Sequence, residues 1–193
     1  MRRLCKTLKR NGKKSTLILG GIFSARYQHD RGERIIMGTL NLNNTMYLSY
    51  PEGFTELTRE EISQMNTTDS PPVWAINDND RHMIVNGAFR QASGFQAFML
   101  NAKDVATEME KQIARPMKPY GYKRDKFFVK ECGGVQGAGF SYTYTAQDID
   151  MCGESYVFEH DKVFYYLYFY YRKELIETGR ATAEEILQSI SWQ

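Results

Sequence analysis

The side chains that could do chemistry in this sequence are few, and they are widely spaced. The thiols and imidazoles are Cys5, Cys132, Cys152, His29, His82 and His160. They form none of the short-range pairs, such as CxxC or HExxH, from which zinc sites are built. An odd number of cysteines without such pairs is typical of free thiols in a reducing cytoplasm. The sequence therefore predicts no metal and no cofactor, but it leaves open a disulfide between Cys132 and Cys152 on adjacent strands.

A nucleophilic site would need a reactive side chain beside a base. No GxSxG turn marks a serine nucleophile, so the arrangement that remains is Cys132 or Cys152 paired with His160. A buried thiol and a turn histidine explain the same residues without chemistry. We therefore assign no catalytic, cofactor-binding or metal residue and expect a protein that is not an enzyme. The alternative is a small hydrolase or small-molecule-binding enzyme whose site is assembled from scattered residues.

The glycine-rich segment Gly133-Gly-Val-Gln-Gly-Ala-Gly139 invites comparison with a phosphate-binding loop. Such a loop ends in Gly-Lys-Ser/Thr or opens a helix as GxGxxG. Here the glycines occur in the order GxxGxG and precede Phe140-Ser-Tyr-Thr-Tyr, which has the composition of a strand. The segment is therefore predicted to be a turn or bulge between strands.

Carboxylates gather in two further places. Asp148, Asp150 and Glu154 surround one expected turn, and Asn77-Asp-Asn-Asp80 forms another. Carboxylate oxygens can bind Ca²⁺, but the D-x-D-x-D-G order of an EF-hand, with its distal glutamate, is absent. We expect solvated turns at both places.

Charge divides the chain near residue 46. Residues 1–46 contain 10 Lys and Arg against Asp30 and Glu33, a net charge of +8. Residues 47–193 contain 15 Lys and Arg against 21 Asp and Glu, a net charge of −6. Segments whose net charges differ this much are best analysed separately. We therefore divide the chain into a basic N-terminal extension, residues 1–45, and a single domain, residues 46–193.

The N-terminal extension admits several interpretations. A basic run precedes the apolar run Leu17–Phe23, which is the order of a secretory signal peptide. That apolar run is short and contains two glycines, so we expect a cytoplasmic protein, with secretion as the alternative. A membrane span would need about 20 apolar residues. We favour a solvated, partly ordered arm; charge-driven contact with nucleic acid or an anionic surface, or a start mis-assigned upstream of Met37 or Met46, are the alternatives.

The first half of the domain is expected to combine short strands with two capped helices. A strand beginning at Met46 ends in a Pro-containing turn, and the capping box Thr58-x-x-Glu61 opens a helix over about residues 59–65. The turn at 77–80 joins strands over 73–76 and 81–89. A strand over 95–100 then leads to Asn101, which caps a helix over 102–115. The apolar stripe of that helix is formed by Val105, Met109 and Ile113.

In the second half the hydrophobic period changes to two. Four strands are predicted, over 126–131, 139–146, 156–159 (beginning as early as Met151) and 163–172, and they form an antiparallel meander. A second capping box, Thr182-x-x-Glu185, is expected to open a terminal helix. The predicted fold class is α+β: an antiparallel sheet of about six to seven strands with helices packed on its faces.

The last predicted strand, Val163–Arg172, is apolar or aromatic on both faces. Aromatic side chains on a sheet can stack on the bases of single-stranded nucleic acid, but such platforms need surrounding basic residues. The net charge of the domain is negative, so we expect no nucleic-acid binding by the folded body. A central strand covered by helices explains the pattern better.

The order of these elements resembles the PsbP-like fold, which the extrinsic photosystem II protein shares with the Ran-binding Mog-type import factor. Two motifs carry the resemblance, Pro51-Glu-Gly-Phe54 and Ile186-Leu-Gln-Ser-Ile190, within a span of about residues 46–192. The small uncharacterised bacterial members of that group are the nearest. The resemblance implies an α/β/α sandwich that works as a binding or assembly protein without catalysis. It implies no site residue.

Together these features favour a non-catalytic interaction module that binds another protein through a sheet edge or a helix face. They identify neither the partner nor the oligomeric state.

Overall fold

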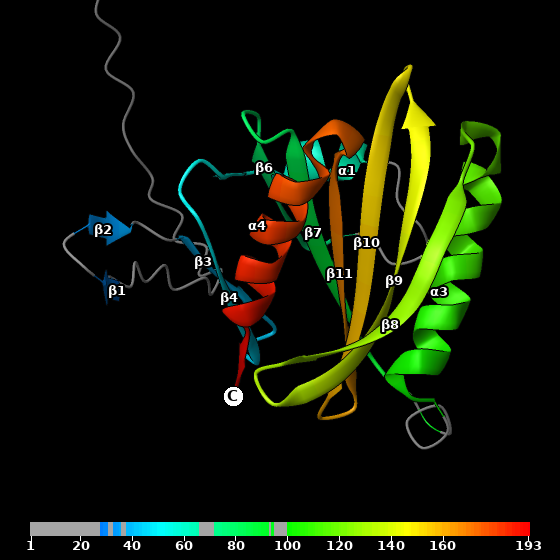
Figure 1. Ribbon diagram of the computed structural model, residues 1–193. Helices are drawn as coiled ribbons and strands as arrows, with labels where there is room; N and C mark the ends of the chain where they lie inside the picture. The colour runs from blue at the N-terminus through cyan, green and yellow to red at the C-terminus, as the bar shows by residue number, and fades with distance from the viewer. Residues whose placement is uncertain (1–27, 31–32, 36–37, 66–71, 93, 95–99) are drawn as a thin grey trace, which may run out of the picture.

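Seven antiparallel strands form the main sheet of the protein, seen in a computed structural model that describes residues 28–30, 33–35, 38–65, 72–92, 94 and 100–193 (Figure 1). Their order across the sheet is β5-β6-β7-β11-β10-β9-β8. The strands are β5 (Thr55–Glu56), β6 (Trp74–Asp78), β7 (Met83–Gln91), β8 (Lys123–Cys132), β9 (Val135–Ala146), β10 (Ile149–His160) and β11 (Val163–Arg172). The predicted antiparallel meander is confirmed as β8 to β11; β8, β9 and β10 are longer than expected, and β11 has the predicted bounds.

A second sheet has three strands, in the order β12-β4-β3. They are β3 (Gly38–Leu42), β4 (Met46–Tyr50) and β12 (Ser191–Trp192), and a separate pair is formed by β1 (Gln28–Asp30) and β2 (Glu33–Ile35). The expected domain boundary at residue 46 falls at the end of the β3–β4 hairpin turn. Leu42, which precedes this boundary, is only 1% exposed and belongs to the core. We therefore expect the division between extension and domain at or before Gly38.

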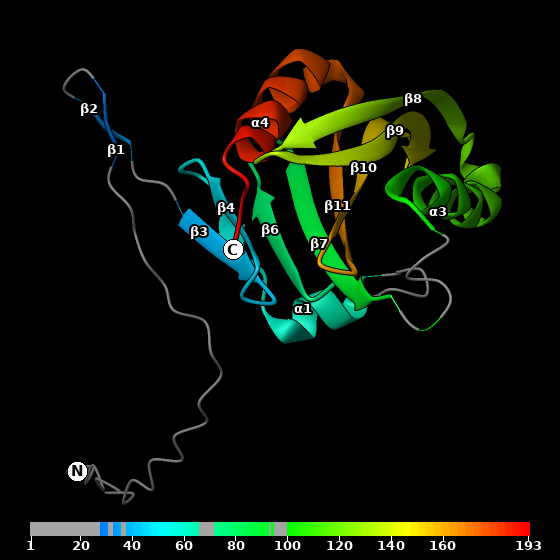
Figure 2. The ribbon, with the colours of Figure 1, turned by 90° about the horizontal axis from the view of Figure 1, so that it is seen from below.

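The helices cover both faces of the main sheet, as Figure 2 shows. Helix α3 (Ala102–Met117) packs on one face, and α4 (Ile176–Gln188) lies on the other face with the second sheet. The short helix α1 (Arg59–Gln64) begins at the predicted capping box, and Asn101 caps α3 as predicted. The 3-10 turns η1 (Lys118–Tyr120) and η2 (Lys173–Leu175) follow α3 and precede α4. The α+β prediction is therefore confirmed, including the layered arrangement.

Helix α4 does not begin where the sequence pattern indicated. The second capping box at Thr182 was expected to open it, but the helix begins six residues earlier, at Ile176, and Thr182 is buried in its middle. The apolar face simply continues upstream, and Gly179 allows the helix to lie against the ring of Tyr171. A Cβ atom at Gly179 would come within 2.5 Å of that ring.

Strand β11 is the fourth of seven strands and separates the two hydrophobic cores. Tyr165, Phe169 and Tyr171 belong to the core under α4, whereas Phe164 and Tyr166 belong to the core under α3. The prediction that this strand is central and buried on both faces is confirmed.

Tight two-residue turns join the meander strands. Gly133 and Gly134 have φ values of 59° and 83° and form the predicted turn between β8 and β9, whereas the rest of the glycine-rich segment, residues 135–139, belongs to β9. Asp161 and Lys162, with φ values of 50° and 61°, connect β10 to β11. Positive φ at both turn positions matches the right-handed twist of the flanking strands. The predicted strand over 95–100 lies almost entirely outside the described residues.

Among the helices in the part of the chain that the structure describes, none has the length and apolar character needed to cross a bilayer.

Candidate functional site

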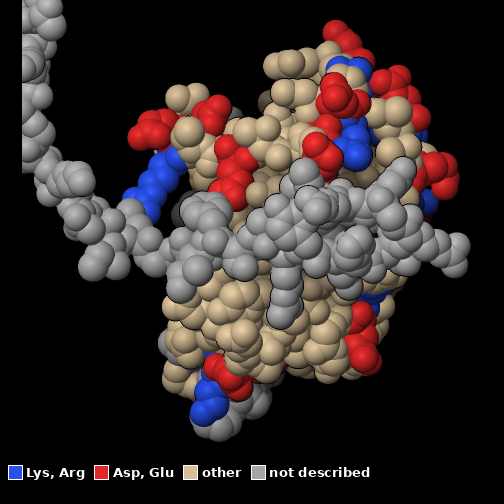
Figure 3. All heavy atoms as spheres, turned by 90° about the vertical axis from the view of Figure 1, so that its left-hand side faces the viewer, with Lys and Arg blue, Asp and Glu red and all other residues tan. Residues whose placement is uncertain are grey.

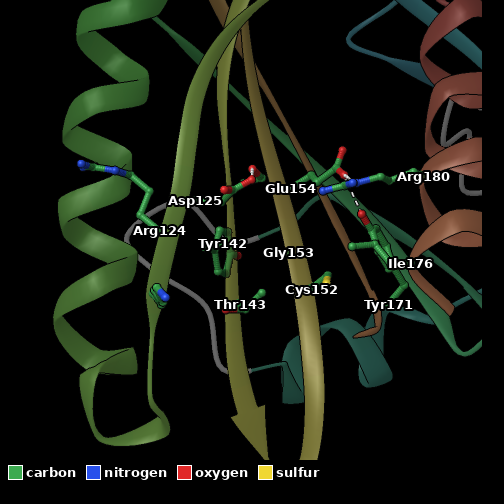
Figure 4. A pocket seen from close by; sticks show the side chains of 12 residues that line it. Arg124, Asp125, Tyr142, Thr143, Cys152, Gly153, Glu154, Tyr171, Ile176 and Arg180 are labelled. Carbon is green, nitrogen blue, oxygen red and sulfur yellow. Dashed lines mark hydrogen bonds and ion pairs between the residues drawn. The ribbon is translucent and has the colours of Figure 1, made fainter. Parts of the chain in front are cut away.

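A cleft of about 390 Å³ lies between the main sheet and the first turns of α4 (Figure 4). Neighbouring strands of the sheet form its floor, and Ile176 and Arg180 of α4 form one wall. The floor residues that matter for its chemistry are Asp125 of β8, Ser141 of β9, Glu154 of β10 and Tyr171 of β11. None of these four was predicted as a functional residue.

The strand register places three polar side chains in a row across this floor. Ser141 pairs with Glu154 between β9 and β10, so the two side chains point to the same face. A bulge between Arg124 and Lys126 leaves Asp125 as the extra residue of β8. The carboxylate of Asp125 accepts a hydrogen bond of 3.1 Å from the Ser141 hydroxyl. The bulge therefore turns a carboxylate toward the cleft at the edge of the sheet.

Glu154 is the most buried carboxylate of the row, with an exposed fraction of 8%. It accepts hydrogen bonds from the hydroxyls of Tyr156 (2.7 Å) and Tyr171 (2.5 Å). Arg180 Nε lies 3.6 Å from its carboxylate. The expectation of a solvated turn is wrong for Glu154, because β10 continues through it and buries it beneath α4.

The electrostatics of this group favour anchoring over proton transfer. Burial raises the pKa of Tyr156, and the neighbouring carboxylate raises it further. Burial also comes first among the causes that raise the pKa of Tyr171, followed by its hydrogen bond to Glu154. Both phenols therefore stay protonated and donate to Glu154, whose oxygens already have partners. The arrangement fixes α4 on the sheet, whereas Asp125 and Ser141 hydrogen-bond to each other and take no part in it.

The two buried cysteines do not meet. Cys132 pairs with Val135 of β9 and Cys152 with Thr143, eight residues further along the same strand. At about 3.3 Å per residue these positions lie far beyond the reach of a disulfide, and both thiols are free. The open alternative of a Cys132–Cys152 bridge is therefore wrong, because β9 lies between β8 and β10.

Neither thiol is set up as a nucleophile. Burial raises the pKa of Cys132 to about 11 and also raises the pKa of Cys152. His160 lies eight residues from Cys152 on β10 and packs against the ring of Trp192, at 5.1 Å between ring centroids. Cys152 and His160 are therefore separated along β10. Cys132 and His160 both lie beside Trp192, but among the described residues no hydrogen bond joins the thiol to the imidazole.

The other predicted candidates are also separated. His82 lies in the turn between β6 and β7, and the side chain of His29 is outside the described residues. Asp78 was expected in a solvated turn, but it is 1% exposed and forms an ion pair with Arg81. Within the described ranges no three His, Cys, Asp or Glu side chains are grouped so that they could hold a metal ion.

A second candidate is the outer edge of β8, the last strand of the main sheet. In Figure 2 this strand arches over the sheet between α4 and α3. Two of its apolar side chains are exposed on the α3 side: Phe127 at 41% and Val129 at 62%. Phe127 is held in place by two neighbours. Its ring packs against that of Phe140, at 5.8 Å between ring centroids, and the guanidinium carbon of Arg124 lies 4.8 Å from the Phe127 ring centroid. The edge therefore presents a fixed aromatic ring beside an exposed aliphatic side chain.

Among the described residues, the face on the α4 side carries no extended field of one sign. In Figure 3, acidic side chains with fewer basic ones among them lie above the grey atoms, and a mostly uncharged area lies below them. Residues 38–51, in β3 and β4, contain no charged residue. Binding to nucleic acid is dominated by phosphate contacts with basic side chains, so this face offers little support for it.

The sequence matches no known protein-family model and no curated protein. Several solved structures align with the chain. The solution structure of cyanobacterial PsbP (CyanoP) from Synechocystis sp. PCC 6803 aligns with a TM-score of 0.60 at 10% identity, covering 91% of this chain and 97% of that one. LpqN of Mycobacterium tuberculosis, described as involved in cell envelope biogenesis, aligns with a TM-score of 0.49 at 11% identity, covering 90% and 92% of the two chains. The first likeness establishes a PsbP-like fold, and the second is too distant to argue from.

Proposed function

We propose that this protein is a non-catalytic interaction module that binds a protein partner along the outer edge of β8. The observation that carries the proposal is the pair Phe127 and Val129, exposed side by side on one face of an edge strand. An open edge offers unpaired backbone N–H and C=O groups to an added strand. Exposed apolar side chains beside that edge supply the contact area that backbone hydrogen bonds alone lack.

The geometry of β8 supports this choice over the other sheet edges. β5 has only two residues, and β3 adjoins positions outside the described residues. β8 has ten residues and, among the described residues, pairs on one side only. The two faces of β8 lie toward α3 and toward α4. A strand bound at its edge would therefore direct alternate side chains to these two sides.

Photo-crosslinking tests the proposal directly. Benzoyl-phenylalanine placed at Val129 in the full chain, expressed in the native host, is expected to give one discrete adduct. The same group at Ile149, which is also exposed but lies at the opposite end of the meander, is the matched control and should give none. Equal adducts at both positions, or none at Val129, would overturn the proposal.

The cleft beneath α4 favours a second candidate, the binding of a small polar molecule next to Asp125 and Ser141. Its volume is within the range of ligand sites. A library of small amines and carboxylates would test it by thermal shift, with Asp125→Asn as the comparison. A ligand that stabilises the wild type and not the variant would support this candidate.

The Mog-type and bacterial resemblances, the cytoplasmic location and the absence of catalysis remain predictions.

A further inference from the structure

The five central residues of β8, Lys126-Phe-Phe-Val-Lys130, present different chemistry on their two faces. Phe127 and Val129 pair with Phe140 and Ala138 and therefore share the α3 face. Lys126, Phe128 and Lys130 alternate with them and share the α4 face. On that face two ammonium groups flank one aromatic ring.

Among the described residues, only some of the β8 side chains on the α4 face have a partner within the chain. Phe128 is half-buried and packs on Tyr156 at 5.1 Å between ring centroids. Lys130 forms an ion pair of 2.6 Å with Glu184 of α4. Lys126 is exposed and has no ion pair within the described residues. A lysine ammonium has three N–H donors. Lys130 donates to both carboxylate oxygens of Glu184, so one N–H can still donate to a second carboxylate.

A second copy of this strand is a poor occupant of the edge. Antiparallel pairing about a two-fold axis at Phe128 would place Phe127 opposite Val129 of the second copy. The same register would place Lys126 opposite Lys130, and Asp125 opposite Glu131. Like charges directly opposite each other destabilise a strand pair. The charges that flank the apolar residues therefore disfavour self-association and favour a strand of opposite charge.

Building on the proposed function, we propose that the β8 edge binds an extended segment with the pattern acidic–apolar–any–apolar–acidic. The two apolar side chains would cover Phe127 and Val129 on the α3 face. The two acidic side chains would fall opposite Lys126 and Lys130 on the α4 face, because residues opposite each other share a face. The pattern is the same in both directions, so it applies to an antiparallel or a parallel strand.

A protective role for the lysines is the competing explanation. Lysines that flank an apolar run on an edge strand keep such edges from pairing with other chains. In that case charge reversal would increase aggregation and would confer no preference between peptides. The two explanations therefore differ in what happens when the lysines become glutamates.

A nuclear magnetic resonance titration of the ¹⁵N-labelled full chain separates them. The probes are two capped peptides, Gly-Asp-Val-Thr-Val-Asp-Gly and its counterpart with Lys in place of both Asp residues. We expect the acidic peptide to shift amide signals of residues 126–130 and to bind roughly tenfold more tightly than the basic one. In Lys126→Glu/Lys130→Glu the preference should reverse. A matched control, Lys103→Glu/Lys111→Glu on α3, should keep the wild-type preference.

The outcomes are distinguishable. Reversal of the preference supports the proposal, and a misfolded variant could not produce it. Equal binding of both peptides, or aggregation of the variant without reversal, overturns it. If neither peptide binds while the crosslink at Val129 persists, the proposed function stands and this partner chemistry is wrong; if both are absent, both fail. A wild-type dimer in sedimentation equilibrium that Val129→Lys dissolves would assign the edge to a second copy instead.

Discussion

The carboxylate of Glu154 on β10 accepts a 2.5 Å hydrogen bond from the hydroxyl of Tyr171 on β11. The register pairs Glu154 with Phe169, so this bond runs diagonally across the strands, two residues along β11. Tyr156, two residues further along β10, donates to the other carboxylate oxygen. One carboxylate thus ties two strands together directly beneath the helix that carries Arg180.

Removing that carboxylate should destabilise the fold strongly. Glu154→Ala would leave two buried phenol hydroxyls without their acceptor and Arg180 without its counter-ion. We expect a loss of about 3–5 kcal/mol in the free energy of unfolding, measured by urea denaturation. Tyr171→Phe removes a single hydrogen bond and should cost about 1–3 kcal/mol. Glu108→Gln, at an exposed carboxylate of α3, is the control and should change stability by less than about 0.5 kcal/mol.

Asp78 should make stability depend on acid pH. Burial acts to raise its pKa, but hydrogen bonds from the Arg81 backbone and guanidinium outweigh it, so the pKa is lowered overall. A lowered folded-state pKa means that the stabilisation is present above the unfolded pKa of about 3.9 and is lost as the pH falls through the folded value. Urea melts from pH 6 down to 3 should show this decline. A profile equally steep in Asp78→Asn would contradict the assignment.

The buried thiols should be unreactive in the native protein. With a pKa of about 11 for Cys132, roughly a thousandth of that side chain is thiolate at pH 8. In a Cys5→Ala variant, iodoacetamide at pH 8 is expected to label neither Cys132 nor Cys152, and to label both in urea. Mass spectrometry of the peptides measures this. Dithiothreitol should leave the melting temperature unchanged, since both thiols are free.

The β3 strand should be needed for full stability. Residues 38–193 are expected to melt cooperatively at nearly the temperature of the full chain. Residues 46–193 lose Leu42 from the core and one side of β4, so their unfolding free energy should fall by at least about 2–5 kcal/mol, the usual cost of deleting a buried leucine side chain. Equal melts for the two fragments would restore the boundary at residue 46.

The aromatic strand β11 should behave as core on both faces. Phe169→Ala, at a fully buried position, should cost about 3–5 kcal/mol. Tyr166→Ala, on the opposite face, should also lower stability, because α3 covers that face. Fluorescence anisotropy with labelled poly-dT or poly-U is expected to detect no binding to the folded body. Micromolar binding that weakens steeply with salt would contradict the last point.

Local sequence signals predicted the local parts of this structure well. Thr58 and Asn101 cap their helices because a cap depends on only four neighbouring residues. The same kind of signal failed at Thr182, where packing of Gly179 against Tyr171 extends the helix upstream. Tertiary contact overrides a short motif whenever the apolar face continues past it.

The candidate sites depended on strand order, which no local pattern encodes. The sequence pattern indicated a turn at Glu154, whereas the strand order places this residue inside β10, between β9 and β11. Lys126-Phe-Phe-Val-Lys130 looked like an ordinary strand until it proved to be the last strand of the sheet. The one usable signal was the pair of lysines flanking an apolar run, which is typical of edge strands.

Ser189 and Ser49 join two segments of the chain that are synthesised at different times. The Ser189 hydroxyl accepts from the backbone N–H of Ser49 at 2.7 Å and donates to its carbonyl oxygen at 3.0 Å, across 140 residues. Beside them, Ser191 and Trp192 supply the strand that borders β4. Because a ribosome releases the chain from its N-terminus, the β3–β4 hairpin emerges well before the segment that borders it. The meander, whose contacts are local, can form before this long-range contact is made, so the outer edge of β4 stays unpaired while the meander folds.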